Sequence, residues 1–144
     1  MFSKTCEYAI RAMIFVAHKS KDGDKIGIKE IAKGIDSPEH FIAKILQDLG
    51  KKGLIHSLKG PNGGFYFEED ILCHSIADIV KAIDGDKLFV GCGLGLKECS
   101  PIKPCPIHNE FEKVRNSMKT MLEGAKLNQF TDGLSKNLTF LNRK

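Results

Sequence analysis

The sequence predicts a mainly helical α+β fold, with a winged helix-turn-helix domain, a small β-hairpin wing and a long C-terminal dimerisation helix. Three observations support this fold class. Two short amphipathic segments flank a turn, a glycine-rich turn separates two apolar stretches, and a later segment repeats its apolar residues every three or four positions. A chain of 144 residues is long enough for one such domain and a helical extension.

Residues 5–53 are expected to form three helices. Residues 5–19 carry one apolar face, and residues 28–34 form a short amphipathic helix that Gly34 ends. In the third helix Ser37 is the expected N-cap and Pro38 the first helical residue. Its buried stripe is Phe41, Ile42, Ile45, Leu46 and Leu49, and its opposite face is His40, Ala43, Lys44 and Gln47.

The middle of the chain is read as a hairpin, a helix and a loop. Residues 54–67, "LIHSLKGPNGGFYF", give a strand, a tight turn and a second strand. Residues 75–85 form a helix with a capping box of Ser75 and Asp78, and Gly85 ends it. Residues 90–106 form a loop by composition.

A long helix begins near His108. Six apolar residues follow at intervals of 4, 3, 4, 3 and 4, which is typical of a packing surface between two helices. These residues form the predicted dimer interface: Ile107, Phe111, Val114, Met118, Met121 and Ala125. The tail beyond them shows only a helix-like spacing of Leu134, Leu138 and Leu141.

Composition and patterning exclude several classes of protein. No apolar run approaches the roughly 20 residues that a membrane span needs. The first residues resemble a secretion signal, but Glu7 and Arg11 interrupt the apolar run and no small-residue cleavage site follows, so we expect a cytoplasmic protein. We find no Ser/His/Asp arrangement, phosphate-binding glycine loop or paired carboxylates, so we do not expect an enzyme.

The helix-turn-helix and wing suit double-stranded DNA. A helix fits the major groove, and a lean hairpin tip can approach the phosphates or the minor groove. Residues 40–64 hold four lysines against one acid, a local charge of +3, although residues 1–70 are almost neutral. The same residues in another context would be an ordinary solvated surface, and tight binding would need two copies. The DNA-binding candidates are Ser37, Pro38, His40, Ala43, Lys44, Gln47, Lys51, Lys59, Gly60, Asn62 and Gly63.

Three of the five cysteines lie in the loop "CGLGLKECSPIKPCPIH" with the spacing C-x6-C-x5-C-x2-H. Disulfides are rare in the cytoplasm, and the loop lacks the paired close cysteines of most zinc sites. An iron–sulfur cluster suits this spacing best, while zinc, a thiol redox switch or unliganded cysteines remain alternatives. Cys92, Cys99 and Cys105 would be ligands, and a fourth could come from His108, Glu7 or Cys6.

Several stretches together resemble bacterial winged-helix repressors of the iron–sulfur regulator type. They are "EYAIRAM", "IKEIAKGIDSPEHFIAKILQDLGKKGLI", the wing "KGPNGGFYF" and "SIADIVKAIDG" before the cysteine loop. With the loop and the long helix, the resemblance covers nearly the whole chain. That family includes a cluster-biogenesis regulator, a nitric-oxide-sensing repressor and a cysteine-metabolism repressor.

The resemblance implies a homodimer in which the long helices cross and each cluster lies near the partner's first helix. Biogenesis-type regulators use a histidine after the third cysteine, where His108 stands, and the redox sensors use an acidic residue in the first helix, where Glu7 stands. The histidine favours a 2Fe–2S over a 4Fe–4S cluster. The first cysteine gap is one residue longer than usual, and the glycine-rich "GLGLKE" would absorb that residue. Ala43 replaces a glutamate that helps the biogenesis regulator choose between DNA motifs.

We therefore expect residues 1–85 to bind DNA, residues 86–106 to hold the cluster and residues 107–144 to form the dimerisation helix and tail. The expected function is that of a transcriptional regulator, in the first place a repressor, whose operator binding depends on the cluster. Through the cluster it would sense redox state, nitric oxide or iron–sulfur supply. The alternatives are a small iron–sulfur or zinc redox protein without DNA function, and a cluster-free regulator that senses through a partner protein.

Overall fold

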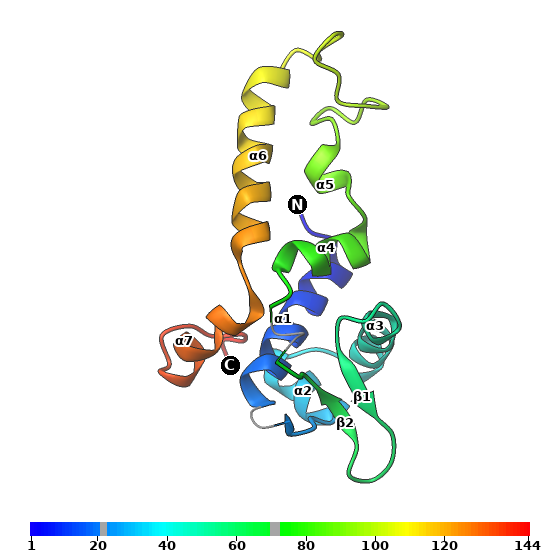
Figure 1. Ribbon diagram of the computed structural model, residues 1–144, viewed down its shortest axis with the longest axis vertical. Helices are drawn as coiled ribbons and strands as arrows, with labels where there is room; N and C mark the ends of the chain where they lie inside the picture. Colours follow the sequence, from blue (N-terminus) through cyan, green and yellow to red (C-terminus); the bar gives the residue numbers. More distant parts are fainter. Residues whose placement is uncertain (21–22, 70–72) are drawn as a thin grey trace.

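The computed structural model describes residues 1–20, 23–69 and 73–144. It confirms a mainly helical chain with one two-stranded antiparallel hairpin. The molecule is elongated, and the wing and the cysteine loop lie at opposite ends of its long axis (Figure 1). The elements in order are α1 (Lys4–Lys19), α2 (Ile28–Ile35), α3 (Glu39–Lys51), β1 (His56–Leu58), β2 (Gly64–Tyr66), α4 (Ile76–Asp84), α5 (Lys87–Val90), α6 (His108–Gly124), η2 (Leu127–Gln129) and α7 (Thr131–Ser135).

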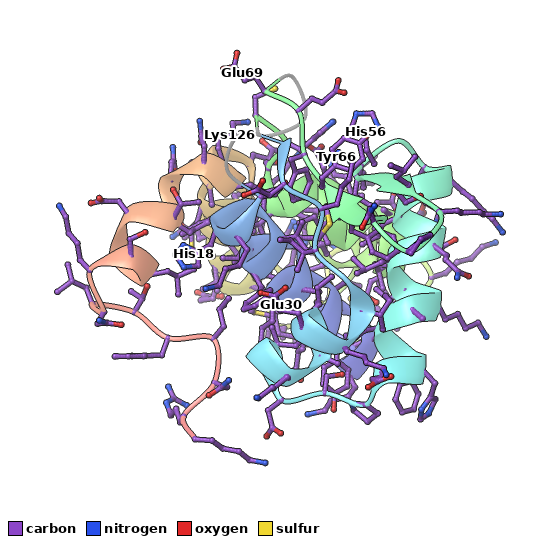
Figure 2. All side chains as sticks on the ribbon, turned by 90° about the horizontal axis from the view of Figure 1, so that it is seen from below. His18, Glu30, His56, Tyr66, Glu69 and Lys126 are labelled. Atoms are coloured by element: carbon purple, nitrogen blue, oxygen red, sulfur yellow. The ribbon has the colours of Figure 1, made fainter. Side chains whose placement is uncertain are left out.

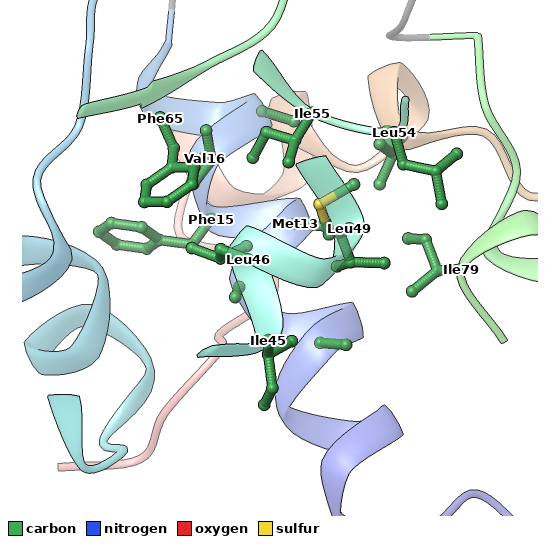
Figure 3. Close-up of a cluster of buried hydrophobic side chains, with 14 of the residues drawn as sticks. Met13, Phe15, Val16, Ile45, Leu46, Leu49, Leu54, Ile55, Phe65 and Ile79 are labelled. Atoms are coloured by element: carbon green, nitrogen blue, oxygen red, sulfur yellow. The ribbon is translucent and has the colours of Figure 1, made fainter. Parts of the chain in front are cut away.

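The hydrophobic core forms around α1, which contacts α2, α3, α4 and α7. Met13 of α1, Leu46 and Leu49 of α3 and Ile79 of α4 are fully buried, and Figure 3 shows them meeting below the hairpin residues. Truncating such a residue to alanine costs about 2–5 kcal/mol, because the removed atoms leave a cavity. The core therefore fixes α3 and the hairpin on one rigid body.

The second helix ends one residue later than Gly34 predicts. Gly34 lies inside α2, and Asp36 ends the helix in the left-handed conformation with φ 54°. A Cβ on Gly34 would lie 2.1 Å from the ring of Phe15. The glycine thus allows α2 to approach α1 closely, and its role is packing rather than helix termination.

The third helix differs from its prediction in two places. It begins at Glu39, with Pro38 at the N-cap, and the hydroxyl of Ser37 donates to the Pro38 carbonyl rather than capping the helix. Phe41 is 51% exposed, so its predicted place in the buried stripe is wrong. Its ring stacks on Tyr8 of α1 with 6.4 Å between centroids and contacts the His40 ring at 4.5 Å.

The wing is a short antiparallel ladder that pairs His56 with Tyr66 and Leu58 with Gly64. An isolated bridge from Ile26 to Phe65 holds the hairpin to the segment before α2. The predicted capping box at the start of α4 is confirmed, since the Ser75 hydroxyl accepts from the Asp78 N–H and the Asp78 carboxylate accepts from the Ser75 N–H.

The long helix α6 has 17 residues, about 25 Å at 1.5 Å per residue. Its predicted interface residues separate into two rows. Ile107, Val114 and Met121 are exposed, whereas Phe111, Met118 and Ala125 are partly buried against the same chain. One residue after each member of the exposed row, His108, Arg115 and Leu122 are buried.

The residues after α6 return to the helix-turn-helix. Leu127 is fully buried beside α1, and α7 packs on the same helix. The helix-like spacing of the three tail leucines does not correspond to one helix, because α7 ends at Ser135 and Asn137 adopts a left-handed conformation. Within the described residues, no helix has the length and apolar character needed to span a bilayer.

Candidate DNA-binding surface and cysteine-loop site

The outward face of α3 carries the predicted DNA-contacting side chains. Ile42, Ile45, Leu46 and Leu49 are buried, and this arrangement turns His40, Lys44, Gln47 and Lys51 to solvent, with Ala43 half-buried among them. Ser37 is half-buried and Pro38 exposed just before the helix. The predicted face therefore exists as one surface of donors and cations that suits base edges and phosphates.

The wing tip is narrow and accessible to solvent. Lys59, Gly60 and Asn62 are exposed, and Gly60 adopts a φ of 107° that favours glycine. A Cβ on Gly63 would lie 1.9 Å from the Leu58 carbonyl oxygen, so only glycine allows this tight turn. The predicted wing residues are thus placed together at a protruding tip (Figure 1).

One cation at the base of the wing was not predicted from the sequence. The ammonium of Lys25 lies 4.6 Å from the centroid of the Tyr66 ring, and the His56 ring stacks on the same tyrosine at 5.4 Å. Lys25 precedes α2 in a polar turn, and only the bridge between Ile26 and Phe65 brings it to the wing. No local signal in the sequence could have placed it there.

The structure brings one loop cysteine and the predicted histidine together. The Sγ of Cys99 lies 3.3 Å from Nδ1 of His108, which is only 6% exposed at the start of α6. On the other side of the ring, Nε2 lies 3.4 Å from a carboxylate oxygen of Glu112, one helical turn later. A carboxylate that accepts from one ring nitrogen fixes the tautomer and orientation of the other, so His108 is held toward the cysteine loop.

The other two cysteines of the trio lie at the two ends of the loop and interact with each other. The backbone N–H of Leu94 donates to the Sγ of Cys92 at 3.4 Å. This bond, with further backbone hydrogen bonds from Leu96 and Gly95 and one involving the Cys105 thiol, holds the pKa of Cys92 below its usual value. A lowered pKa favours the thiolate, the form that binds metals. Nowhere in residues 1–20, 23–69 and 73–144 do three His, Cys, Asp or Glu side chains converge on one metal position.

The two alternative fourth ligands lie elsewhere. Glu7 is about half exposed on α1, where it pairs with Lys4 at 3.6 Å and lines a hollow with Phe2, Ile10 and Arg11. Cys6 is fully buried, and burial, with the nearby Asp84 carboxylate, raises its pKa to about 12. Cys6 therefore stays a neutral thiol, and of the three candidates only His108 lies beside a loop cysteine within the described chain.

Two contacts besides that of Cys99 with His108 join the cysteine loop to α6. Arg115, which is buried, donates from Nη1 to the Gly91 carbonyl at 3.0 Å, directly before Cys92. Gly93 approaches the ring of Phe111 so closely that a Cβ there would lie 2.8 Å from ring atoms. Neither the Arg115–Gly91 hydrogen bond nor the Gly93–Phe111 contact was predicted, because both depend on how the loop folds back on α6.

Comparisons with known proteins agree with the fold. The family model described as Rrf2, iron-dependent transcriptional regulator, matches residues 2–133. The HTH-type transcriptional regulator NsrR of Bacillus licheniformis is 25% identical over 118 residues, which cover 81% of this chain and 82% of that protein. The structure of CymR, the global cysteine regulator of B. subtilis, is similar with a TM-score of 0.72 at 19% identity, covering 92% of this chain and 96% of CymR. T. potens IscR gives a TM-score of 0.71 at 19% identity, covering 96% of this chain and 92% of IscR.

The family match spans the helix-turn-helix, the wing, the cysteine loop and α6. Regulators of this family bind DNA and typically dimerise, and they are not enzymes. The chain belongs to the Rrf2 family of winged-helix transcriptional regulators.

Proposed function

We propose that this regulator binds operator DNA as a homodimer and that an iron–sulfur cluster held by Cys92, Cys99 and Cys105 sets its affinity. The observation that carries the proposal is the position of His108, buried and turned to Cys99 by Glu112 at the start of α6. An imidazole placed in this way at the end of a three-cysteine loop suits a fourth ligand, because metal-binding histidines are commonly oriented by a carboxylate on their other ring nitrogen.

The donor set of the loop fits an iron–sulfur cluster. Thiolates are the ligands of such clusters, and an imidazole can replace a thiolate in 2Fe–2S centres. Within the described chain the donors lie as two pairs, Cys92 with Cys105 and Cys99 with His108. The loop also lacks the paired close cysteines of most structural zinc sites, which favours a cluster over zinc. When bound, the cluster supplies a centre that oxidation, nitric oxide or iron shortage can alter.

His108 is the proposed fourth ligand, and the histidine favours a 2Fe–2S centre. To act as a ligand, Glu7 would have to leave its ion pair with Lys4 and reach the cysteine loop of a second copy. That position would require α1 to pack against the second copy. His108 needs no such rearrangement, because it already lies 3.3 Å from a cluster ligand. Glu7 is therefore proposed as a residue near the site of the second copy rather than as a ligand.

The homodimer is proposed to form along the exposed row of α6. Ile107, Val114 and Met121 recur every seven residues and leave their side chains in solvent, and the loop adds exposed Leu94 and Ile102 at the same end. A row of this period is the pattern by which two helices pack. Pairing there would leave the two recognition helices free to read half-sites about 34 Å apart.

Loop and helix would communicate through the two contacts described above. A change in the cluster would alter the loop at Cys92, and the Arg115–Gly91 bond and the Gly93–Phe111 contact would pass the change to α6. Because α6 packs on α4 and α4 on α1, the spacing of the two DNA-binding domains would follow. A coupling of this kind typically amounts to about 1–3 kcal/mol, or 5- to 150-fold in affinity.

The test is to purify the protein without oxygen and to record its absorbance and Mössbauer spectra, its iron content and its affinity for the DNA upstream of its own gene. We expect a coloured protein, loss of colour in Cys92→Ala, Cys99→Ala and Cys105→Ala, and a changed spectrum in His108→Ala but not in Glu7→Ala. Cys73→Ala is the matched control outside the loop. A colourless, iron-free protein that still binds its operator would refute the cluster and leave the DNA-binding regulator.

The alternative of a redox protein without DNA function is set aside, because the family match covers the DNA-binding parts as well as the loop. Under the proposal the regulator acts in the cytoplasm and represses its targets.

A further inference from the structure

The segment after α7 returns to the turn between α2 and α3. The side-chain amide of Asn142 donates to the Gly34 carbonyl at 2.6 Å, and the ammonium of Lys144 lies 2.9 Å from a carboxylate oxygen of Asp36. Leu141 packs against the core beside them. In Figure 2 this last segment runs along the edge of the molecule. Residues 141–144, which we name the return segment, therefore contact the helix-turn-helix from outside.

Stability does not explain the contact of Lys144 with Asp36. The Lys144 side chain is 77% exposed and that of Asp36 is about half exposed. Ion pairs this accessible contribute about 0–1 kcal/mol, because water screens the attraction and two side chains lose freedom. The Lys144–Asp36 pair therefore contributes little to the stability of the fold, and its effect is on the charge at the turn between α2 and α3.

The charge matters because two acids stand where DNA would approach. Asp36 lies in the turn and Glu39 begins α3, and both are exposed at the N-terminal end of the recognition helix. The first helix of a helix-turn-helix crosses the DNA backbone, and the second enters the groove by its N-terminal end. A carboxylate there would repel phosphates, and Lys144 neutralises one of the two.

A shallow polar hollow lies at the same place. It has a volume of about 550 Å³, and it is lined by three lysines, two acids and two further polar residues: Lys29, Lys33, Lys144, Asp36, Glu39, Ser37 and Asn142. Lys29 and Lys33 are one helical turn apart and exposed, so they share a face of α2. Three ammonium groups from two distant parts of the chain thus stand against two carboxylates around one accessible depression, and the excess charge there is positive.

We propose that the return segment is part of the DNA-binding surface, and that Lys144 joins Lys29 and Lys33 in holding a backbone phosphate of duplex DNA beside the start of α3. The inference rests on DNA binding by this chain and adds a contact outside the helix-turn-helix and the wing. Each phosphate contact lowers the slope of log K against log salt by about 0.9, so Lys144 contributes a measurable share.

The experiment measures binding of the full chain and of Lys144→Ala to a fluorescent 30-bp duplex from upstream of its own gene, by anisotropy between 50 and 200 mM salt. We expect the slope for Lys144→Ala to be less steep by about 0.9 per subunit, or about 1.8 for a dimer. Between the two salt concentrations the wild-type affinity then falls about twelvefold more than that of the variant. Asn142→Ala, which frees the segment from Gly34, is expected to change the slope in the same direction.

Lys136→Ala is the matched control. Lys136 is an exposed lysine of the same C-terminal region that pairs with Asp132 at 3.1 Å and does not line the polar hollow, so its removal should leave the slope unchanged. A slope for Lys144→Ala equal to that of the wild type overturns the proposal. So does a weaker affinity with an unchanged slope and a lowered melting temperature, since that result would make the segment a structural clamp. Failure of the wild-type chain to bind any duplex would instead refute its DNA-binding function.

Discussion

Replacing Gly93 by alanine tests whether the cysteine loop and α6 act as one unit. A Cβ at this position would lie 2.8 Å from two ring atoms of Phe111, whereas ordinary contacts are 3.4–4 Å. Ring and loop must therefore separate by at least about 0.6 Å, and overpacking of this kind costs about 1–3 kcal/mol. Gly93 does not have a positive φ, so the backbone itself tolerates alanine and the steric conflict is the only change.

Since Gly93 follows Cys92 directly, we expect this strain to destabilise the loop conformation that holds the cluster. A cost of about 1–3 kcal/mol corresponds to a 5- to 150-fold weaker affinity of the loop for the cluster. The assay follows the visible absorbance of the anaerobic protein during titration with an iron chelator. The double variant Gly93→Ala with Phe111→Leu should regain most of the hold, because the smaller side chain restores the space.

Gly124→Ala, at the end of α6, is the control, because nothing lies within 4 Å of a Cβ there. We expect it to retain the cluster as the wild type does. The reasoning is refuted if Gly93→Ala loses its cluster no faster than Gly124→Ala while both remain folded.

Four further outcomes are expected. Glu112→Gln should alter the cluster spectrum without lowering the melting temperature, because the carboxylate near Nε2 orients His108; an unchanged spectrum would remove Glu112 from the site. Gly63→Ala should weaken DNA binding at least tenfold with cluster content intact, since its Cβ would meet a backbone oxygen of the hairpin at 1.9 Å; binding as tight as wild type would count against the wing. Val114→Glu, at a position 66% exposed, should give a monomer in sedimentation velocity, and a persistent dimer would place the interface elsewhere. Burial acts to raise the pKa of Asp78, but hydrogen bonds at the helix N-cap outweigh it and hold that pKa below its usual value. A depressed carboxyl pKa gives stability that is present above about pH 4 and is lost as pH falls through the folded-state value. Asp78→Asn should thus unfold about 1 kcal/mol more easily at pH 7, and in urea titrations the difference should vanish as the pH falls through the folded-state pKa of Asp78.

Much of the candidate site could be predicted because its signals are local. The spacing of cysteines and histidine is a property of 17 consecutive residues, and His108 does lie beside Cys99. The polar face of α3 follows from helical periodicity, and its four buried residues confirm it. Glu112 was missed, although a carboxylate four residues after a candidate ligand is a local signal that could have identified it.

The sequence by itself determined helices α1 to α4 and α6, the hairpin, the capping box at Ser75 and the loop with its cysteines. These features depend on residues within one or two turns of each other, whose preferences are written in their order along the chain. Only the tertiary structure decided that Gly34 serves the packing of α2 on Phe15, that Phe41 faces solvent and that residues 141–144 reach the turn at Asp36. The reason is that close packing joins residues distant in sequence, and which pairs meet is fixed by how all the elements fill space together.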